Sequence, residues 1–242
     1  MFEELQRVGY DIRTLQHARA IIESEFPDAL NELQQVIVPT KIPIKELVFG
    51  GGGKTKVVKR LEDRFTERDW LKHNFHLTKL VDGVATQSMS HEIDHVKRFQ
   101  HGVLALEIEW NNKDPFFDRD LQNFRQLHAD GAISIGIIIT RGVSLQDGFK
   151  DKMASFARAQ SITSLQQLAT YYTPTPAQRR SILSGIESGH SFEESWANNF
   201  VASKFGRSTT HWDKLIDRVD RGVGNPCPLI LIGIPLSAVV EE

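Results

Sequence analysis

The stretch VLALEIEW, residues 103–110, places two acids inside an apolar run. Its alternation is typical of a β-strand, so Glu107 and Glu109 share one face with Val103 and Ala105. Neighbours on one face of a strand lie about 6.5 Å apart. Two carboxylates held so close on a stiff strand repel each other unless a cation or a shared proton neutralises them. A fold that contains this strand must therefore supply one or the other beside it.

A third acid precedes this strand. Asp94 lies thirteen residues before Glu107 in the run EIDHV, which suits two adjacent antiparallel strands joined by a loop at residues 97–102. Three carboxylates that meet at one point form a site for Mg²⁺, which takes oxygen ligands and keeps waters and substrate phosphate. Hydrolysis of a phosphodiester uses such a site. In the alternative interpretation, Glu107 and Glu109 are simply the solvated face of an edge strand.

The segments around this strand predict an α/β fold. The segment FFDRDLQNFRQLHA, residues 116–129, has apolar residues at helical spacing, and a near-continuous apolar run follows it at residues 133–140. A strand, a helix and a buried strand in this order form a parallel crossover. Residues 11–26, 28–37 and 57–70 carry apolar stripes typical of helices.

The order of these segments resembles the BglII and BstYI group of type II restriction endonucleases, which have the PD-(D/E)XK nuclease core. The resemblance rests on Asp94, the strand LALEIEW, the helix and apolar strand after it, and the final run CPLILIGIP from Cys227. It implies a mixed central sheet flanked by helices. Two features depart from the group: Glu109 replaces its Gln, or the commoner Lys, as in the Glu-x-Glu variant of BamHI, and the gap from Asp94 to Glu107 is a few residues longer.

The resemblance implies a Mg²⁺-dependent endonuclease that cuts a short palindromic site in double-stranded DNA and leaves 5′-phosphate ends. A palindrome is read most simply by a two-fold symmetric protein, so a homodimer is implied, together with a cognate DNA methyltransferase in the host. Asp94 and Glu107 would hold the metal, with a backbone carbonyl near Ile108 as a further ligand. Glu109 would orient or deprotonate the attacking water.

The group also has a polar residue shortly after a tryptophan that helps to complete the active site. In this chain His73 and Asn74 follow Trp70 at such a distance and are the candidates for that role.

Two other functions are compatible with the sequence. Residues 91–95, HEIDH, match H-E-x-x-H, in which two histidines one helical turn apart, here His91 and His95, bind Zn²⁺ and Glu92 activates water in a peptidase. The apolar strand that follows within a few residues opposes this interpretation, because a zincin helix would continue with apolar spacing. In the other alternative, the helical C-terminal half binds DNA without cutting it.

DNA contacts are expected mainly in two polar segments. Residues 50–55, GGGGKT, resemble a Walker A loop but have Val48 where its first glycine would stand; their backbone N–H groups and lysine can still hold phosphates. A second run of hydrogen-bond donors begins at Lys204. Either segment could instead be a plain solvated loop. The expected DNA contacts are Lys54, Lys56, Arg141, Lys204, Arg207, Ser208, Thr209 and Thr210.

Composition sets the remaining limits. With 242 residues and 40% apolar content the chain can bury one sizeable core, and a net charge of −2 excludes a generally cationic coat for nucleic acid. A single cysteine and a charged, not apolar, N-terminal segment predict a cytoplasmic protein that does not contact membranes. We expect one nuclease domain over residues 1–242, with its core at about 41–142 and 225–236 and a helical insertion at about 150–222.

Overall fold

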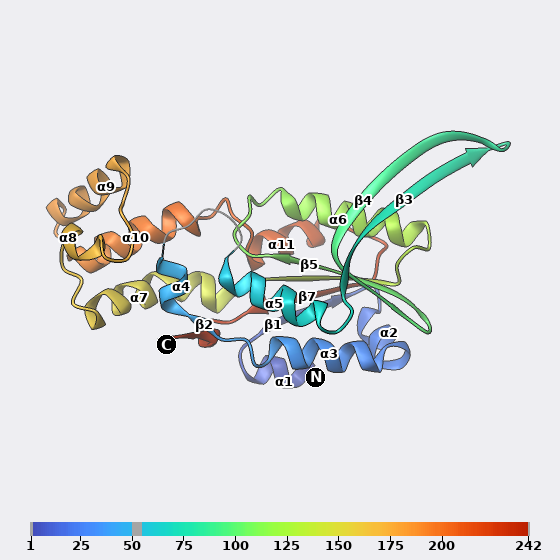
Figure 1. Ribbon diagram of the computed structural model, residues 1–242, viewed down its shortest axis with the longest axis horizontal. Helices are drawn as coiled ribbons and strands as arrows, with labels where there is room; N and C mark the ends of the chain where they lie inside the picture. Colours follow the sequence, from blue (N-terminus) through green and yellow to red (C-terminus); the bar gives the residue numbers. More distant parts are fainter. Residues whose placement is uncertain (1, 50–54, 242) are drawn as a thin grey trace.

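The computed structural model describes residues 2–49 and 55–241. A six-stranded mixed sheet forms its centre, with the strand order β1-β7-β6-β5-β4-β3 (Figure 1). The strands are β1 (Asp11–Leu15), β3 (Leu71–Val81), β4 (Val84–Phe99), β5 (Gly102–Glu109), β6 (Ile135–Arg141) and β7 (Leu229–Ile234). A short parallel pair, β2 (Ile42–Pro43) and β8 (Val239–Val240), forms a second sheet.

The middle of the central sheet consists of β5, β6 and β7, which are parallel to one another. Every residue of β6 and β7 is buried, as are the last six of β5. These strands have helices on both faces, which explains why their sequences are near-continuous apolar runs. Helix α6 (Phe116–Ala129) connects β5 to β6, so the predicted parallel crossover is confirmed.

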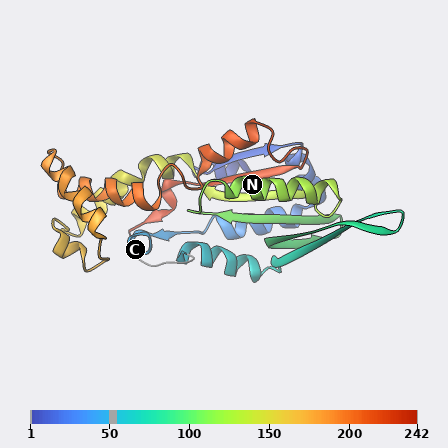
Figure 2. The same cartoon turned by 90° about the horizontal axis from the view of Figure 1, so that it is seen from above.

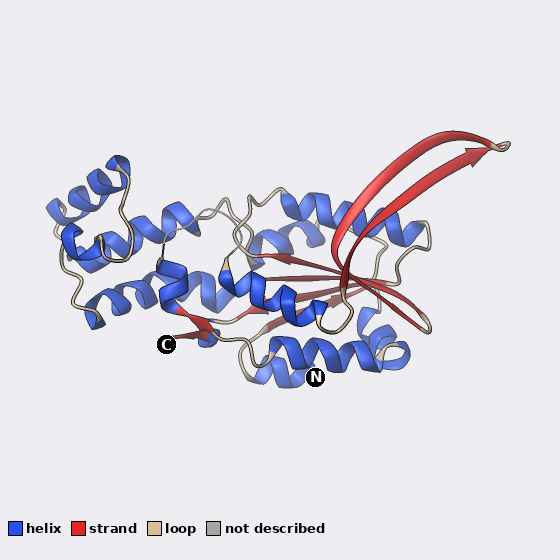
Figure 3. Ribbon diagram, in the orientation of Figure 1, coloured by secondary structure: helices blue, strands red, loops and turns tan. Residues whose placement is uncertain are grey.

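Helices cover both faces of the sheet (Figures 1 and 3). On one face, α6 and α11 (Trp212–Asp220) pack against Ala105, Ile138 and Leu231. The other face forms a larger core with Leu106, Ile137 and Ile232. The helices of that core next to the sheet are α1 (Phe2–Arg7), α2 (Ala18–Glu25), α3 (Pro27–Ile37), α4 (Ile44–Val48), α5 (Lys56–Thr66) and α7 (Val143–Ala159).

Three further helices stack beyond α7 at one end of the molecule (Figures 1 and 2). They are α8 (Leu165–Leu168), α9 (Pro176–Glu187) and α10 (Phe192–Lys204). These helices lie within the helical insertion expected at about 150–222. Two elements do not follow the expected division: β1, which precedes the expected core, is an edge strand of the central sheet, and α11, which falls within the expected insertion, packs on α6. Among the described residues, no helix has both the length and the apolar character needed to cross a bilayer.

The single helix predicted for residues 11–26 is wrong in its first half. Residues 11–15 are β1, which pairs antiparallel with β7. The spacing of Ile12 and Leu15 fits a helix, yet pairing with a buried strand decides the conformation, because strand preference depends on tertiary neighbours more than helix preference does. Two predicted boundaries also differ: α5 ends at Thr66, and β4 continues to Phe99, so the loop expected at residues 97–102 is a tight turn.

Strands β3 and β4 extend out of the sheet as a two-stranded ribbon (Figures 1 and 2). β4 pairs with β5 only from His95 to Phe99, whereas its pairing with β3 continues to Val84. The apolar pattern of the sequence predicts only the short run EIDHV as strand here, so the length of the ribbon is a feature that the structure adds.

Candidate active site

The candidate active site lies where β4 and β5 separate. Their pairing ends with His95 opposite Leu106, so the last three residues of β5 keep a neighbouring strand only on the β6 side. Asp94 precedes His95 in β4 and borders the opening. A cavity of about 480 Å³ occupies it, lined by Asp94, Ile108, Glu109, Asn112, Arg119 and, from α5, Glu62.

Glu107 and Glu109 are both buried in the opening, each with 3% of its surface exposed. Burial, followed by the nearby carboxylates of Asp120 and Asp94, raises the pKa of Glu107 well above its ordinary value. Burial and Asp120 raise the pKa of Glu109 to about 8. The expected meeting of Asp94, Glu107 and Glu109 is thus present in the structure, and the group carries more negative charge than its protein surroundings neutralise.

A fourth acid, Asp120 of α6, joins this group and was not predicted. It is fully buried, and its Oδ1 accepts a hydrogen bond of 2.8 Å from Arg119 Nε and forms an ion pair with Nη2 at 2.7 Å. Its Oδ2 has no nitrogen or hydroxyl donor among the described residues, and the carboxyls of Asp120 and Glu109 are close enough to share a proton. The sequence could have indicated Asp120, because it lies on the apolar stripe of α6 between Phe117 and Phe124, where an acid is uncommon.

Two neighbours fix the orientation of Glu109. The amide of Asn112 donates a hydrogen bond of 2.8 Å to Oε2, and the guanidinium of Arg119 lies 3.5 Å from Oε1. Arg119 itself stacks over the ring of Phe116, 4.5 Å from its centroid. A carboxylate held at both oxygens at the wall of a cavity can present a fixed lone pair to a water molecule.

Asp94 is the most accessible acid of the group. Its side chain is 40% exposed, and the nearest charged partner is Lys72 of β3, with 3.6 Å between Nζ and Oδ1. Lys72 makes a shorter contact of 2.6 Å with Glu92, and this hydrogen bond is the main reason that the pKa of Lys72 is raised. Asp94 is therefore held only loosely and can turn toward a cation in the cavity.

The residues suit a hard divalent cation that takes only a few protein ligands. Within residues 2–49 and 55–241, no three His, Cys, Asp or Glu side chains form a finished metal-ligand set. Mg²⁺ does not need one, because it keeps several waters and binds one or two carboxylates together with substrate phosphate. The raised pKa of Glu107 and the Asp120 oxygen without a donor indicate negative charge that such an ion would neutralise.

The zinc-peptidase interpretation is contradicted by the structure. Residues 91–95 belong to β4 and not to a helix. In a strand, His91 and His95 lie about 13 Å apart, too far to bind one ion. His95 is buried with its ring 5.5 Å from that of Phe65, so it serves the core.

Arg141 was expected to contact DNA, but its side chain lies inside the protein. It is fully buried at the end of β6 and donates to the carbonyls of Trp110 (2.7 Å), Thr210 (2.7 Å) and Phe205 (3.4 Å). Its remaining donors reach the side chains of Gln146 and Thr209, each at 2.6 Å. Thr210 is fully buried as well. These residues form an internal hydrogen-bond cluster, hereafter the Arg141 cluster, which joins β6 to the segment after α10.

The other expected DNA contacts divide by exposure. Lys204 is partly buried, and its ammonium donates to the carbonyl of Leu47 at 2.8 Å, so it ties α10 to α4. Arg207, Ser208 and Lys56 are exposed and can reach a ligand. Lys54 and the four glycines before it lie outside the described residues.

His73 and Asn74 stand on the exposed part of β3, not at the candidate active site. Neither lines the cavity that holds Glu109. The His73 ring packs edge-on against Phe75, with 4.5 Å between centroids, and Asn74 accepts a hydrogen bond from Ser90 at 2.6 Å. The polar residues that complete the active site are instead Asn112 and Arg119, which contact the carboxylate of Glu109.

A comparison with protein-family models places this chain beside a known family. Residues 10–234 match the model of the family described as Restriction endonuclease BglII/BglIII. A comparison with curated proteins finds no match.

Proposed function

Because the chain belongs to the BglII/BglIII family of restriction endonucleases, we propose that it is a Mg²⁺-dependent type II enzyme that cuts a short palindromic site in double-stranded DNA. The observation that carries the proposal is the group of acids at the opening between β4 and β5. Glu107 and Glu109 are buried there beside Asp94 and Asp120, with Arg119 as the adjacent positive charge. Such a group can ionise fully only with a cation, and a cation is what a scissile phosphate requires.

Bound Mg²⁺ would polarise the phosphate and lower the pKa of a water molecule. Asp94 and Glu107 would hold the ion, with a backbone carbonyl near Ile108 as a further ligand. Glu109 accepts the proton of the attacking water. The water oxygen bonds to phosphorus as the bond to O3′ breaks, and O3′ takes a proton from solvent, so the products carry a 5′-phosphate and a 3′-hydroxyl.

The remaining partners follow from the same proposal. A palindromic site implies a homodimer, in which each protomer cuts one strand. A host methyltransferase would protect the chromosome at the same sequence, and both enzymes would act in the cytoplasm. Lys56, Arg207 and Ser208 are the exposed residues that we assign to DNA contact.

Incubation with plasmid DNA tests the proposal. Discrete fragments should form with Mg²⁺ and disappear with EDTA, and Glu107→Gln should bind DNA without cutting it. A shifted band without fragments, at any Mg²⁺ concentration, would establish the non-catalytic alternative. Run-off sequencing of the cut ends then gives the recognition sequence and the position of cleavage.

A further inference from the structure

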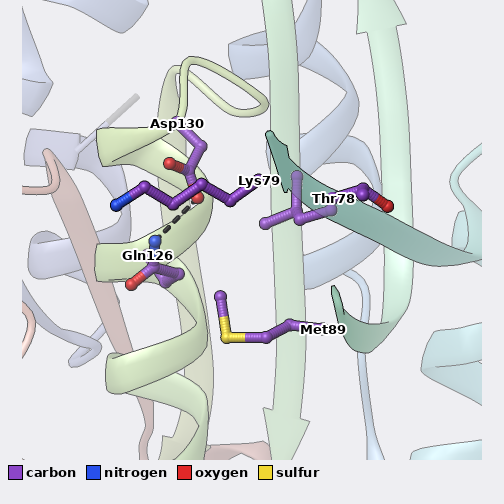
Figure 4. A pocket seen from close by; sticks show the side chains of 6 residues that line it. Thr78, Lys79, Met89, Gln126 and Asp130 are labelled. Carbon is purple, nitrogen blue, oxygen red and sulfur yellow. Dashed lines mark hydrogen bonds between the residues drawn. The ribbon is translucent and has the colours of Figure 1, made fainter. Parts of the chain in front are cut away.

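The β3–β4 ribbon has two chemically different faces. On one face, Phe75, Leu77 and Met89 are covered at least in part. From the ribbon, Leu77, Thr78, Lys79 and Met89 border a cavity of about 610 Å³. The cavity lies between the ribbon and the C-terminal end of α6, where Gln126 and Asp130 form the opposite wall (Figure 4). This face belongs to the body of the protein.

The opposite face carries hydrogen-bonding side chains, and all of them are exposed. Ser90 donates to Asn74, and Glu92 is bonded to Lys72, so the acid on this face is already neutralised. We call this surface the hydroxyl face; it consists of Asn74, His76 and Thr78 from β3 and, paired with them, Ser88, Ser90 and Glu92 from β4.

The hydroxyl face continues from the candidate active site. The pairing of β4 with β3 has no register shift between Ser88 and Glu92, and side chains two residues apart share a face, so Ser88, Ser90 and Glu92 lie on one side of β4. A register shift between Ile93 and Val96 interrupts this alternation at Asp94. Lys72 connects the face to the active site, because its ammonium lies 2.6 Å from Glu92 and 3.6 Å from Asp94. At about 3.3 Å per residue, Ser90 is roughly 13 Å and Ser88 roughly 20 Å from Asp94 along the strand. These distances equal about four to six base pairs of B-DNA.

The shape and chemistry of this surface suit duplex DNA. A two-stranded ribbon fits the major groove, and Ser, Thr and Asn side chains bond to phosphates and base edges. Another protein would be expected to meet an apolar centre, which the hydroxyl face does not have. The ribbon also extends away from the connection between α10 and α11, which contains Arg207 (Figure 1).

We propose that the hydroxyl face binds duplex DNA about four to six base pairs from the scissile phosphate, outside the recognition sequence. This proposal rests on the proposed function. Its contacts are hydrogen bonds, because Lys72, which lies next to the face, is engaged by Glu92. The affinity that the ribbon adds should therefore depend little on salt concentration.

Binding to duplexes of two lengths tests the proposal. In a Glu107→Gln background, which prevents cutting, fluorescence anisotropy compares a 12-base-pair and a 30-base-pair duplex that carry the sequence cut in plasmids. The longer duplex should bind about tenfold more tightly. The triple change Thr78→Ala, Ser88→Ala and Ser90→Ala should reduce this ratio to about two- to threefold and change binding of the short duplex less than twofold, at both low and high salt.

Met89→Ala is the matched control, because it shortens a side chain between Ser88 and Ser90 that points to the covered face. The ratio of its affinities for the long and the short duplex should equal that of the background protein. An unchanged ratio in the triple variant, or equal binding of both duplexes by the background protein, overturns the proposal. A change in the sedimentation of the DNA-free triple variant overturns it too, since the face would then bind a second copy.

A footprint of the parent protein provides a check that does not depend on the folding of the variants. Hydroxyl-radical cleavage should be suppressed about four to six base pairs beyond the cut position, and full cleavage there contradicts the proposal. Failure of the proposed function is a separate outcome, because the wild-type protein would then leave plasmid DNA uncut.

Discussion

Two buried charged groups lie side by side at the same end of the sheet, and their surroundings differ. Glu109 at the end of β5 is in register with Thr140, and Arg141 follows directly in β6. Every hydrogen bond of Arg141 reaches a neutral oxygen within the protein. Glu109 and Glu107 lie beside one another and beside Asp120, whose Oδ2 has no nitrogen or hydroxyl donor in the described part of the chain.

The difference shows how structure separates a structural charge from a functional one. A buried charge whose hydrogen bonds are complete holds segments together and has no capacity left for a ligand. Buried acids whose hydrogen bonds are incomplete and whose charges repel cost stability, and that cost is recovered when a cation binds. The sequence pattern predicts a function for both places, and the number of protein partners decides between them.

The largest expected effect is the loss of DNA cleavage when an acid of the active site is changed. Glu107→Gln should reduce cleavage at least about a thousandfold, equivalent to roughly 4 kcal/mol of barrier. The free energy of unfolding without metal should stay the same or rise, because Gln is neutral at a buried site that disfavours a charged carboxylate. Plasmid cleavage and urea unfolding measure the two quantities. As a control, Glu62→Gln changes an acid of the same cavity and should leave cleavage within about threefold. Near-normal cutting by Glu107→Gln would remove it from the metal site.

Arg141→Met should have the opposite profile. The change leaves the buried carbonyls of Trp110 and Thr210 without their donor, so the free energy of unfolding should fall by at least about 3 kcal/mol. Arg119→Met is the comparison, since Arg119 is 53% exposed and should cost less than about 1 kcal/mol of stability. Equal costs for the two arginines in urea unfolding would show that the Arg141 cluster is not the stabilising element described above.

The pH dependence of stability sharpens the contrast further. The pKa of Glu109 is raised from 4.5 to about 8 in the metal-free fold, so the folded state holds a proton that the unfolded chain releases. The stability tied to this proton is fully present below about pH 4.5 and is lost as the pH rises through about 8, with a slope of at most about 1.4 kcal/mol per pH unit. Urea unfolding in EDTA should show this decline, and Glu109→Gln should flatten it.

Mg²⁺ should act on the same curve. Because the ion favours ionised carboxylates, it should raise the free energy of unfolding more at about pH 8 than at about pH 6. Equal stabilisation at the two pH values would contradict the assignment of the acids as a cation site. The Arg141→Met variant, measured in the same way, should retain this dependence on Mg²⁺.

The smallest expected effect concerns the orientation of Glu109. Asn112→Ala removes its hydrogen bond of 2.8 Å and should slow cleavage about tenfold, or roughly 1.4 kcal/mol. Since this hydrogen bond lowers the pKa of Glu109, its loss should also shift the rising limb of the pH–rate profile upward. Asn111→Ala, in the neighbouring wall of the cavity, should stay within about threefold; a similar loss there would indicate a general disturbance of the loop.

The sequence by itself determined the elements that carry the site. The alternation in β5, the helical stripe of α6 and the apolar runs of β6 and β7 are local periodic patterns, and each reflects which faces of one element are buried. The same patterns placed Glu107 and Glu109 on one face of a strand, and the family pattern added Asp94 across the opening.

Tertiary structure alone decided which buried charges are satisfied. Asp120 meets Glu109 because α6 packs over β5, and Arg141 finds acceptors in Thr209 and Thr210, which follow it by 68 and 69 residues. Residues 11–15 became a strand, and the β3–β4 ribbon acquired its length, through pairing with distant partners. Periodicity records whether a residue is buried, whereas its hydrogen-bond partners come from segments far along the chain, and these long-range contacts are not encoded in any local pattern.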